Sequence, residues 1–397
     1  MMNQRELFLR HVGQTSAAPL SLEIAKATGC RLFDTAGKEY IDLIGGISVA
    51  NTGHRHPAII EAVKKQLDQY LHVMVYGEVV QSPQVQYAKL LADYLPAQLN
   101  SVYFTNSGAE AVEGAMKLAK RYTNRTRIIA AKNSYHGSTQ GALSILGDEY
   151  WRNAYRPLLP DILHIDYNSY EWLHEINEST ACVILETVQA EGGIIAPQAD
   201  WLQTVRKKCS ETGALLVLDE IQAGFGRTGK LWGFEHFNVV PDILLLGKAL
   251  GGGMPLGAFV SDRNIMMALT ENPVLGHITT FGGHPVSCAA GLAALKVVLD
   301  EQLAETVALK EELFKSLLTH PLIKNINSFG LWMAVDMGTF ELNKKLIDTI
   351  LENETMGVFT DWFLFAASSF RICPPLTISE AEIREACSII INALNNL

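Results

Sequence analysis

Between about residue 100 and residue 262, short apolar runs alternate with longer segments of helical period. The runs cover residues 101–105, 127–131, 181–186, 214–219, 242–246 and 257–261. They are apolar throughout instead of alternating with polar residues, which is typical of strands that helices cover on both faces. This order of strands and helices predicts an α/β fold in which a mostly parallel sheet forms the core of a large domain.

The two ends of the chain show a different pattern. A turn centred on Gly37 lies near the amino terminus, and amphipathic helical stretches cover residues 301–318 and 379–397. We predict that residues 48–290 form the large domain. Residues 1–47 and 291–397 are expected to come together in a small α+β domain.

The composition indicates a globular protein that acts on small molecules. Of its 397 residues 48% are hydrophobic, so the chain can bury more core than one ordinary domain needs. The formal net charge of −10, without any block of like charges, argues against a nucleic-acid partner. The cysteines are scattered and form no C-x-x-C pair, as expected of reduced thiols. Residues 1–16 lack a signal-peptide core and no later run could span a bilayer, so we expect a cytoplasmic protein without a membrane partner.

Small polar residues and a glycine follow the first apolar run. Asn106, Ser107 and Gly108 end the strand and precede a helical segment. Free backbone N–H groups and the positive end of the helix dipole meet at such a junction, which makes it suitable for a phosphate group. The alternative is a simple helix cap by Asn106 or Ser107.

Two charged residues lie at the ends of later apolar runs. Asp219 ends the fourth run, and a carboxylate there needs a cation or hydrogen-bond donors, which a protonated pyridine ring would supply. Lys248 follows the fifth run directly and precedes three glycines, so its amine is expected to be desolvated and to have a lowered pKa, as Schiff-base chemistry requires. The alternatives are an Asp219 that caps a turn and a Lys248 that reaches the surface.

Because ligands bind beyond the carboxyl ends of parallel strands, these three features are expected at one edge of the sheet. Together they identify a resemblance to the class III aminotransferases, a pyridoxal-phosphate family of fold-type I, the aspartate aminotransferase-like fold. The family includes ornithine, acetylornithine, 4-aminobutyrate and polyamine aminotransferases. The resemblance runs from about residue 29 to residue 376 and is most specific over residues 219–229 and 248–253.

The resemblance implies a role for each residue of a pyridoxal 5'-phosphate site. Lys248 would hold the cofactor as a Schiff base and transfer protons, and Asp219 would pair with the pyridinium nitrogen. The remaining cofactor-binding residues that it implies are Ser107, Gly108 and Ala109 at the phosphate, Tyr135 and Ile221 on the two ring faces, Gln222 at the ring hydroxyl, and Thr280. Thr280 would reach the phosphate of the neighbouring subunit, which implies a homodimer with shared active sites.

The resemblance also implies the substrate contacts. Arg371 would bind the substrate α-carboxylate, with Glu186 and Glu191 near it. Ser138 stands where many relatives have an arginine that binds the distal carboxylate. A hydroxyl does not replace a bidentate arginine, so the donor could be one without a carboxylate there, such as a diamine or an acylated amine. The alternatives are substitution by a nearby arginine, such as Arg152 or Arg156, and a change without effect on substrate choice.

The implied activity is amino transfer from an ω-amino acid or diamine, similar to ornithine or N-acetylornithine, to a 2-oxo acid, with 2-oxoglutarate as the expected acceptor. The alternatives within the fold are a 4-aminobutyrate or polyamine (putrescine-type) aminotransferase and a mutase, racemase or decarboxylase. A regulatory module that only binds the cofactor is a further alternative, but we find no basic helix-turn-helix segment beside the fold.

His54 and His56 occupy alternate positions in Gly53-His54-Arg55-His56-Pro57. No acidic or cysteine partner lies close to them in the sequence, and two ligands are too few for a metal site. We therefore predict that both histidines shape a turn and that the protein holds no metal.

Overall fold

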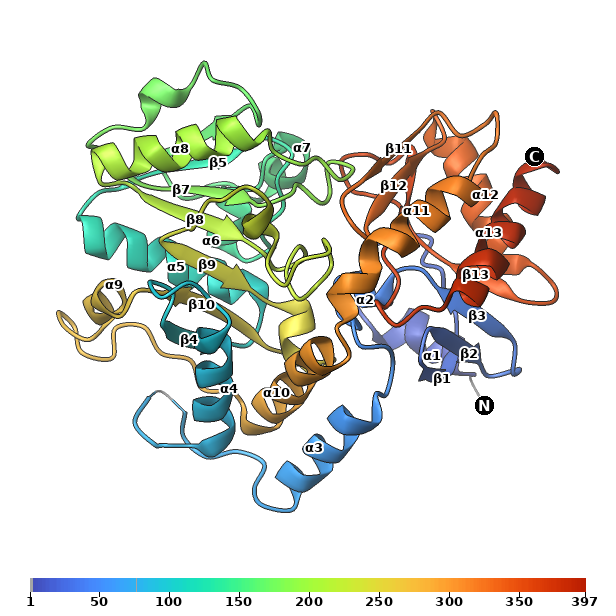
Figure 1. Cartoon of the computed structure of the whole chain (residues 1–397), viewed down its shortest axis with the longest axis horizontal. Coiled ribbons are helices and arrows are strands. Elements are labelled where there is room, and N and C mark those ends of the chain that lie inside the picture. The colour runs from blue at the N-terminus through green and yellow to red at the C-terminus, as the bar shows by residue number, and fades with distance from the viewer. Residues whose placement is uncertain (1–2, 76) are drawn as a thin grey trace.

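The computed structural model describes residues 3–75 and 77–397 and has two lobes (Figure 1). Residues 1, 2 and 76, which the predicted domains include, lie outside the described part. A seven-stranded sheet of order β4-β10-β9-β8-β7-β5-β6 forms the centre of the larger lobe. Its strands are β4 (Ser101–Thr105), β5 (Arg127–Ala131), β6 (Ile162–Ile165), β7 (Thr180–Glu186), β8 (Leu215–Asp219), β9 (Ile243–Leu246) and β10 (Gly257–Ser261).

All six predicted strands of this sheet are present, and the mostly parallel character of the sheet is confirmed. The pairs β5–β6, β5–β7, β7–β8 and β8–β9 are parallel. β10 is antiparallel to both of its neighbours, β4 and β9. The sequence pattern did not predict β6, because this run is only four residues long and includes the polar His164.

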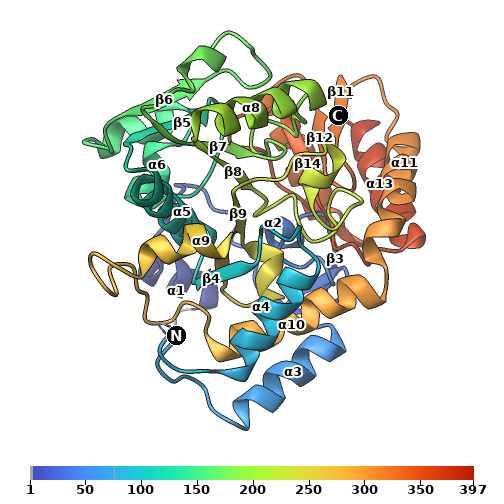
Figure 2. The same cartoon turned by 60° about the vertical axis from the view of Figure 1, so that its left-hand side comes forward.

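The central strands bury both of their faces. In β8, Leu216 and Leu218 pack into the core on one side, whereas Leu215 and Val217 pack into the core on the other. Helix α8 (Ala199–Thr212) covers the first side, and α5 (Gly108–Thr123) covers the second (Figure 2). This two-sided packing explains why these runs are apolar throughout instead of alternating.

The smaller lobe contains residues from both ends of the chain. β1 (Ile24–Thr28), β2 (Arg31–Asp34), β3 (Glu39–Asp42) and β13 (Gly357–Phe359) form one sheet, and β11 (Asn325–Ser328), β12 (Met333–Asp336) and β14 (Ser369–Ile372) form another. β13 lies parallel to β3 and so joins the two ends. Gly37, with a φ of +86°, makes the predicted turn between β2 and β3.

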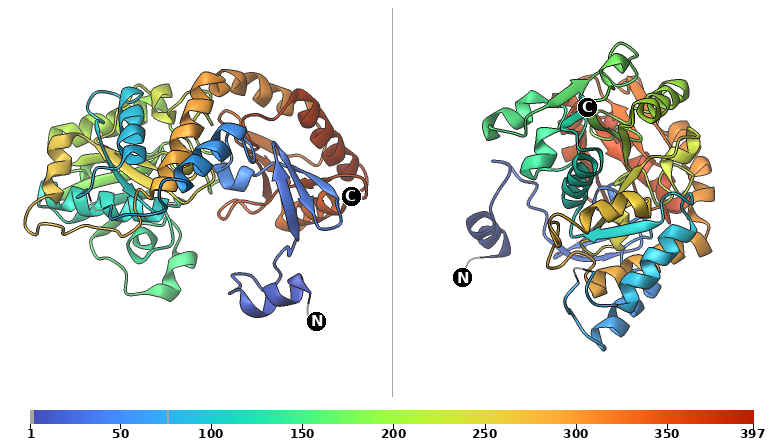
Figure 3. Two further views of the ribbon diagram at one scale, coloured as in Figure 1. Left: turned by 90° about the horizontal axis from the view of Figure 1, so that it is seen from below. Right: turned by 90° about the vertical axis from the view of Figure 1, so that its left-hand side faces the viewer.

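The helices of this lobe are α11 (Val307–Leu317), α12 (Phe340–Glu352) and α13 (Glu380–Leu394), and they share one apolar core with its strands. Helix α10 (Pro285–Asp300) continues through the predicted boundary at residues 290 and 291, so the exact domain limits stay a prediction. Helix α1 (Gln4–His11) buries none of its side chains and extends away from the rest of the molecule (Figure 3).

Shorter elements complete the fold. The other α-helices are α2 (Gly45–Ser48), α3 (Pro57–Leu67), α4 (Ser82–Asp93), α6 (Gln140–Ser144), α7 (Glu149–Arg152) and α9 (Arg263–Met266). The 3-10 helices are η1 (Asn153–Tyr155), η2 (Leu173–Glu175), η3 (Gly233–His236), η4 (Lys248–Gly251), η5 (Met267–Leu269) and η6 (Leu303–Thr306). Over the described part of the chain, none of the helices has the length and apolarity that crossing a membrane requires.

His54 and His56 each contact a carboxylate near the junction of the lobes. His54 Nε2 lies 2.7 Å from Asp42 Oδ2, and His56 Nε2 lies 3.0 Å from Glu301 Oε1. The His56 ring also accepts a hydrogen bond from the Ala58 N–H at the start of α3. Both histidines therefore stabilise chain turns and helix ends through single carboxylate or backbone contacts.

Candidate active site

A cavity of about 460 Å³ lies at the carboxyl ends of the central strands. Loops after β5, β7, β8 and β9 and the start of α5 enclose it. Its lining residues are Gly108, Ala109, Tyr135, His136, Gly137, Ser138, Thr139, Glu186, Val188, Asp219, Ile221, Gln222, Ala223 and Lys248. Because the ends of parallel strands meet at one edge, residues far apart in the sequence share this cavity.

The amino terminus of α5 forms one end of the cavity. The first-turn N–H groups of Gly108 and Ala109 have no acceptor within the helix, and both residues line the cavity. Ser107 caps this helix, since its hydroxyl oxygen accepts a hydrogen bond from the Glu110 N–H at 3.2 Å. A side chain at Gly108 would place its Cβ 2.8 Å from Ile221 Cδ1, so the Ile221 side chain would have to shift to admit it.

Asp219 is buried at the end of β8, and its carboxylate makes two hydrogen bonds. Oδ1 accepts from the Ile221 N–H at 2.9 Å, and Oδ2 lies 2.7 Å from His136 Nδ1. Burial acts to lower the pKa of His136, but the hydrogen bond to Asp219 and its charge outweigh burial and raise it. A protonated His136 would fix the negative charge of Asp219 in a side chain that is only 5% exposed.

The sequence did not predict a role for His136. It lies in the Tyr135-His136-Gly137 turn, 83 residues before its partner Asp219, so no local pattern indicates the contact. His136 Nε2 and Gln222 Oε1 are buried and have no hydrogen-bond partner among the described residues. Unpaired buried polar atoms are costly, and both residues line the cavity, which is the pattern expected where a polar ligand binds.

Lys248 begins η4, which Gly247 separates from β9, and has a φ of +50°. Its side chain lines the cavity and makes no hydrogen bond or ion pair in the described part of the chain. Burial lowers its pKa from 10.5 to about 8, although the charges of Glu191, Asp219 and Glu186 partly oppose the shift. The lowered pKa increases the share of Lys248 that is a neutral, nucleophilic amine near neutral pH.

Glu186 is buried beside Asp219 at the end of β7 and lines the same cavity. It accepts hydrogen bonds from the Tyr135 N–H at 3.0 Å and the Ala190 N–H at 2.9 Å. Burial raises its pKa to about 7, although His136 and the two N–H groups lower it. Its side chain thus joins the loop after β5 to the loop after β7, and both loops border the cavity.

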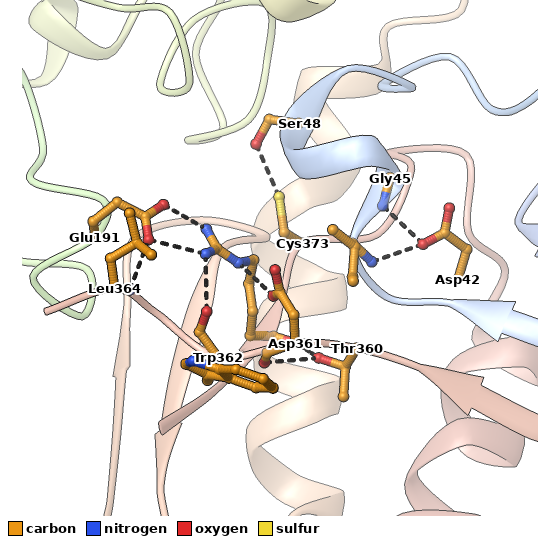
Figure 4. Close-up of polar contacts among 11 residues, drawn as sticks. Asp42, Gly45, Ser48, Glu191, Thr360, Asp361, Trp362, Leu364 and Cys373 are labelled. Carbon is orange, nitrogen blue, oxygen red and sulfur yellow. Dashed lines mark hydrogen bonds and ion pairs between the residues drawn. The ribbon is translucent and has the colours of Figure 1, made fainter. Parts of the chain in front are cut away.

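Arg371 is 2% exposed in β14 and binds the carboxylates of Glu191 and Asp361, which are labelled in Figure 4. Its Nη1 and Nη2 atoms each lie 3.1 Å from an oxygen of Glu191, and its Nε donates to Asp361 Oδ1 at 2.8 Å. The guanidinium carbon lies 4.2 Å from the centre of the Phe363 ring. Glu191 follows β7 in the large lobe, so this ion pair connects the two lobes beside the cavity without lining it.

Ser138 is exposed at the wall of the cavity, and its hydroxyl lies 3.1 Å from the Tyr135 hydroxyl. The two nearby arginines are engaged elsewhere. Arg152 Nε and Arg156 Nη2 lie 2.7 and 2.6 Å from oxygens of Glu149. In this structure, therefore, neither arginine supplies a positive charge at Ser138.

The cavity brings together most of the predicted cofactor residues. Gly108, Ala109, Tyr135, Asp219, Ile221, Gln222 and Lys248 all line it. Ser107 is just outside, as the cap of α5. Thr280 is exposed and does not line the cavity of its own chain.

Proteins of a known family are similar to this chain in sequence and fold. The family model described as Aminotransferase class-III matches residues 12–394. The acetylornithine aminotransferase of Methanopyrus kandleri is 38% identical over 399 residues, which cover 99% of each chain. The chain belongs to the class III aminotransferases. The acetylornithine aminotransferase of Caldanaerobacter subterraneus is 36% identical and covers 94% of this chain and 95% of its own.

The solved structure of the ornithine aminotransferase from Toxoplasma gondii superimposes on this aminotransferase with a TM-score of 0.90. The two chains are 30% identical, and the match covers 98% of this chain and 92% of the other. That structure contains pyridoxal phosphate at the active site in partial occupancy. The fold-type I architecture and the pyridoxal-phosphate dependence of this aminotransferase are thereby confirmed, and its substrates are a small amine donor and a 2-oxo acid acceptor.

Proposed function

We propose that this aminotransferase moves the terminal amino group of an ω-amino acid or diamine, similar to ornithine or N-acetylornithine, to 2-oxoglutarate. One observation carries the chemistry: the lowered-pKa amine of Lys248 and the buried carboxylate of Asp219 line one cavity with the first N–H groups of α5. The relatives named acetylornithine aminotransferase support the substrate class.

The cavity residues fit pyridoxal phosphate. Gly108 and Ala109 offer N–H groups for the phosphate, and Ser107 keeps the helix end in position. Asp219 is the anion for the ring nitrogen, and the unpaired Oε1 of buried Gln222 is an acceptor for the ring hydroxyl. Tyr135 and Ile221 are the apolar surfaces for the two ring faces.

Lys248 would hold the cofactor and then act on the substrate. When bound, the cofactor supplies an electron sink for the substrate carbon that carries the amine. The free amine of Lys248 would take the proton from that carbon as base and deliver it to the cofactor as acid. A pKa of about 8 suits both directions of proton transfer near neutral pH. Asp219, held by His136 and the Ile221 N–H, would pair with the ring nitrogen.

The residues for a substrate carboxylate are Arg371 and its partners. Arg371 would bind the α-carboxylate of the 2-oxo acid, for which Glu191 must first release Nη1 and Nη2. Glu186 keeps the loop around Tyr135 in position. Ser138 leaves the outer wall without a positive charge, which among the proposed donors supports a diamine, because ornithine and N-acetylornithine keep a free carboxylate at the end away from the reacting amine.

We further propose that two copies of this chain share their active sites. Exposed apolar side chains gather in residues 67–85 and 274–281, the second of which contains Thr280; they include Leu67, Leu71, Val73, Met74, Val79, Val80, Val85, Val274, Leu275, Ile278 and Phe281. Such a set favours burial against a second copy, where Thr280 would reach the partner's cofactor phosphate. Sedimentation at twice 43.7 kDa is expected, and a monomer would contradict this proposal.

A cytoplasmic location is also proposed. All six cysteines are free thiols, which is the state that a reducing compartment maintains. Fractionation that recovers the protein outside the cytoplasm would contradict this location.

A donor panel tests the proposed activity. The loaded enzyme is mixed with ornithine, N-acetylornithine, 4-aminobutyrate or putrescine, and kcat/KM is measured with 2-oxoglutarate as the acceptor. Turnover is expected with at least one terminal amine, together with stoichiometric glutamate. Conversion of a substrate without glutamate formation would favour a mutase, racemase or decarboxylase. A kcat/KM that is highest with 4-aminobutyrate would contradict the proposed preference for donors similar to ornithine or N-acetylornithine.

A further inference from the structure

Arg371 has two carboxylate partners on different sides of its guanidinium group. Glu191 accepts from Nη1 and Nη2, whereas Asp361 accepts from Nε alone (Figure 4). The Trp362 carbonyl oxygen lies 3.5 Å from Nη2. The guanidinium group carries one positive charge and its two partners carry one negative charge each. The cluster of Arg371, Glu191 and Asp361 therefore has a net charge of about −1 when all three are ionised.

The two carboxylates differ in how firmly the backbone holds them beside Arg371. Asp361 is fixed to the same strand, because its carbonyl oxygen accepts from the Arg371 N–H at 2.9 Å. Glu191 lies in a separate turn of the large lobe, and its carboxylate has one other partner, the Leu364 N–H at 3.0 Å. A rotation of the Glu191 side chain can free Nη1 and Nη2, but Asp361 remains at Nε.

We propose that Asp361 is a specificity-determining residue that weakens the binding of substrate carboxylates at Arg371 and so favours donors whose reacting carbon bears no carboxylate. This inference deepens the proposed function and rests on Arg371 as the carboxylate-binding residue. With Asp361 in place, a carboxylate at Nη1 and Nη2 meets an arginine whose charge is already neutralised. A terminal amine has no carboxylate next to its reacting carbon and avoids this cost, whereas every 2-oxo acid incurs it.

Asp361 also positions the guanidinium group. Its contact with Nε and the Phe363 ring on one face keep the guanidinium plane fixed when Glu191 leaves. The charge of Asp361 and its hydrogen bond therefore have opposite effects on carboxylate binding. Two substitutions separate them: Asp361→Asn removes the charge and retains an oxygen acceptor, and Asp361→Ala removes both.

The experiment measures binding of glutarate, a dicarboxylate that does not react, to the cofactor-loaded enzyme by calorimetry, and the KM for 2-oxoglutarate. In Asp361→Asn the Kd of glutarate and the KM for 2-oxoglutarate are expected to fall about tenfold, while kcat changes less than about twofold. The efficiency with putrescine should show no such gain. Asp361→Ala should lose the gain in glutarate affinity, because the guanidinium group is then free to turn.

Asp348→Asn is the matched control, since it removes one negative charge from a partly buried ion pair with Lys344 on α12. It should leave glutarate binding unchanged. Equal or weaker glutarate binding by Asp361→Asn would overturn the proposal, as would the same gain in Asp348→Asn. If the natural enzyme transfers no amine from any donor, the proposed substrates are wrong, but the glutarate titration still decides the role of Asp361.

Discussion

Ser138 lies exposed on the cavity wall, and its hydroxyl lies within hydrogen-bond distance of the Tyr135 hydroxyl. An arginine at this position would add a charged, bidentate partner for a distal carboxylate, worth about 1–3 kcal/mol. We expect Ser138→Arg to raise kcat/KM for ornithine, N-acetylornithine and 4-aminobutyrate, which carry a carboxylate, about tenfold or more. The efficiency with putrescine should not rise.

Ser138→Ala is the control for this comparison. It removes the hydroxyl without adding charge, so donor preference should remain that of the natural enzyme. An equal gain for putrescine and for the carboxylate-bearing donors in Ser138→Arg would show that the arginine acts by some means other than carboxylate binding.

Individual residues differ in how far the sequence predicts them. Asp219 and Lys248 end or follow apolar runs, so their place at the sheet edge could be predicted, and both line the cavity. The roles of His136 and Asp361 could not be assigned from the sequence. His136 binds Asp219, which is distant in the sequence, and Asp361 binds Arg371, which belongs to β14. Such contacts depend on the register between elements, which local patterns do not specify.

Gly137 lies in the loop after β5 and packs against Ala109 in the first turn of α5. Its φ is +129°, and an added Cβ would lie 2.6 Å from the Ala109 Cβ. Because neither methyl group can rotate away, Gly137→Ala should displace the start of α5. We expect a loss of about 1–3 kcal/mol in the free energy of unfolding. We also expect a rise of at least about tenfold in the Kd of pyridoxal phosphate. Chemical denaturation measures the free energy of unfolding, and equilibrium dialysis measures the Kd.

Gly37→Ala serves as the control for backbone strain. Gly37 has a φ of +86°, but no atom lies within 4 Å of its added Cβ, and it lies in the β2–β3 turn. This variant should lose stability without losing cofactor affinity. Unchanged cofactor binding in Gly137→Ala would contradict the role of the α5 terminus at the phosphate.

Among the elements, the sequence predicted the strands of the large sheet well because both of their faces are apolar. The antiparallel direction of β10 could not be predicted, since a run buried on both faces has the same composition in either direction. β6 was missed because it is short and lies at the edge of the sheet.

At the scale of the whole molecule, the smaller lobe depends on contacts between the two ends of the chain. β3 pairs in parallel with β13, and Arg371 of β14 reaches Glu191 of the large lobe. The sequence pattern indicated that both ends of the chain differ from its centre, but it could not predict which strands of the two ends pair with each other. Arg371, proposed to bind the substrate, and Lys248, proposed to bind the cofactor, therefore belong to different lobes, and the proposed site requires the intact chain.

Lys248 is proposed to transfer the protons of amino transfer in the cavity at the sheet edge. The most direct test mixes the loaded enzyme with a donor amine, without any 2-oxo acid, and measures pyridoxamine phosphate by mass spectrometry. The natural enzyme should form about one equivalent per active site, whereas Lys248→Ala should retain the cofactor through Gly108, Ala109 and Asp219 and form it at least about 10³-fold more slowly. Formation of pyridoxamine phosphate by Lys248→Ala at the natural rate would contradict this role of Lys248.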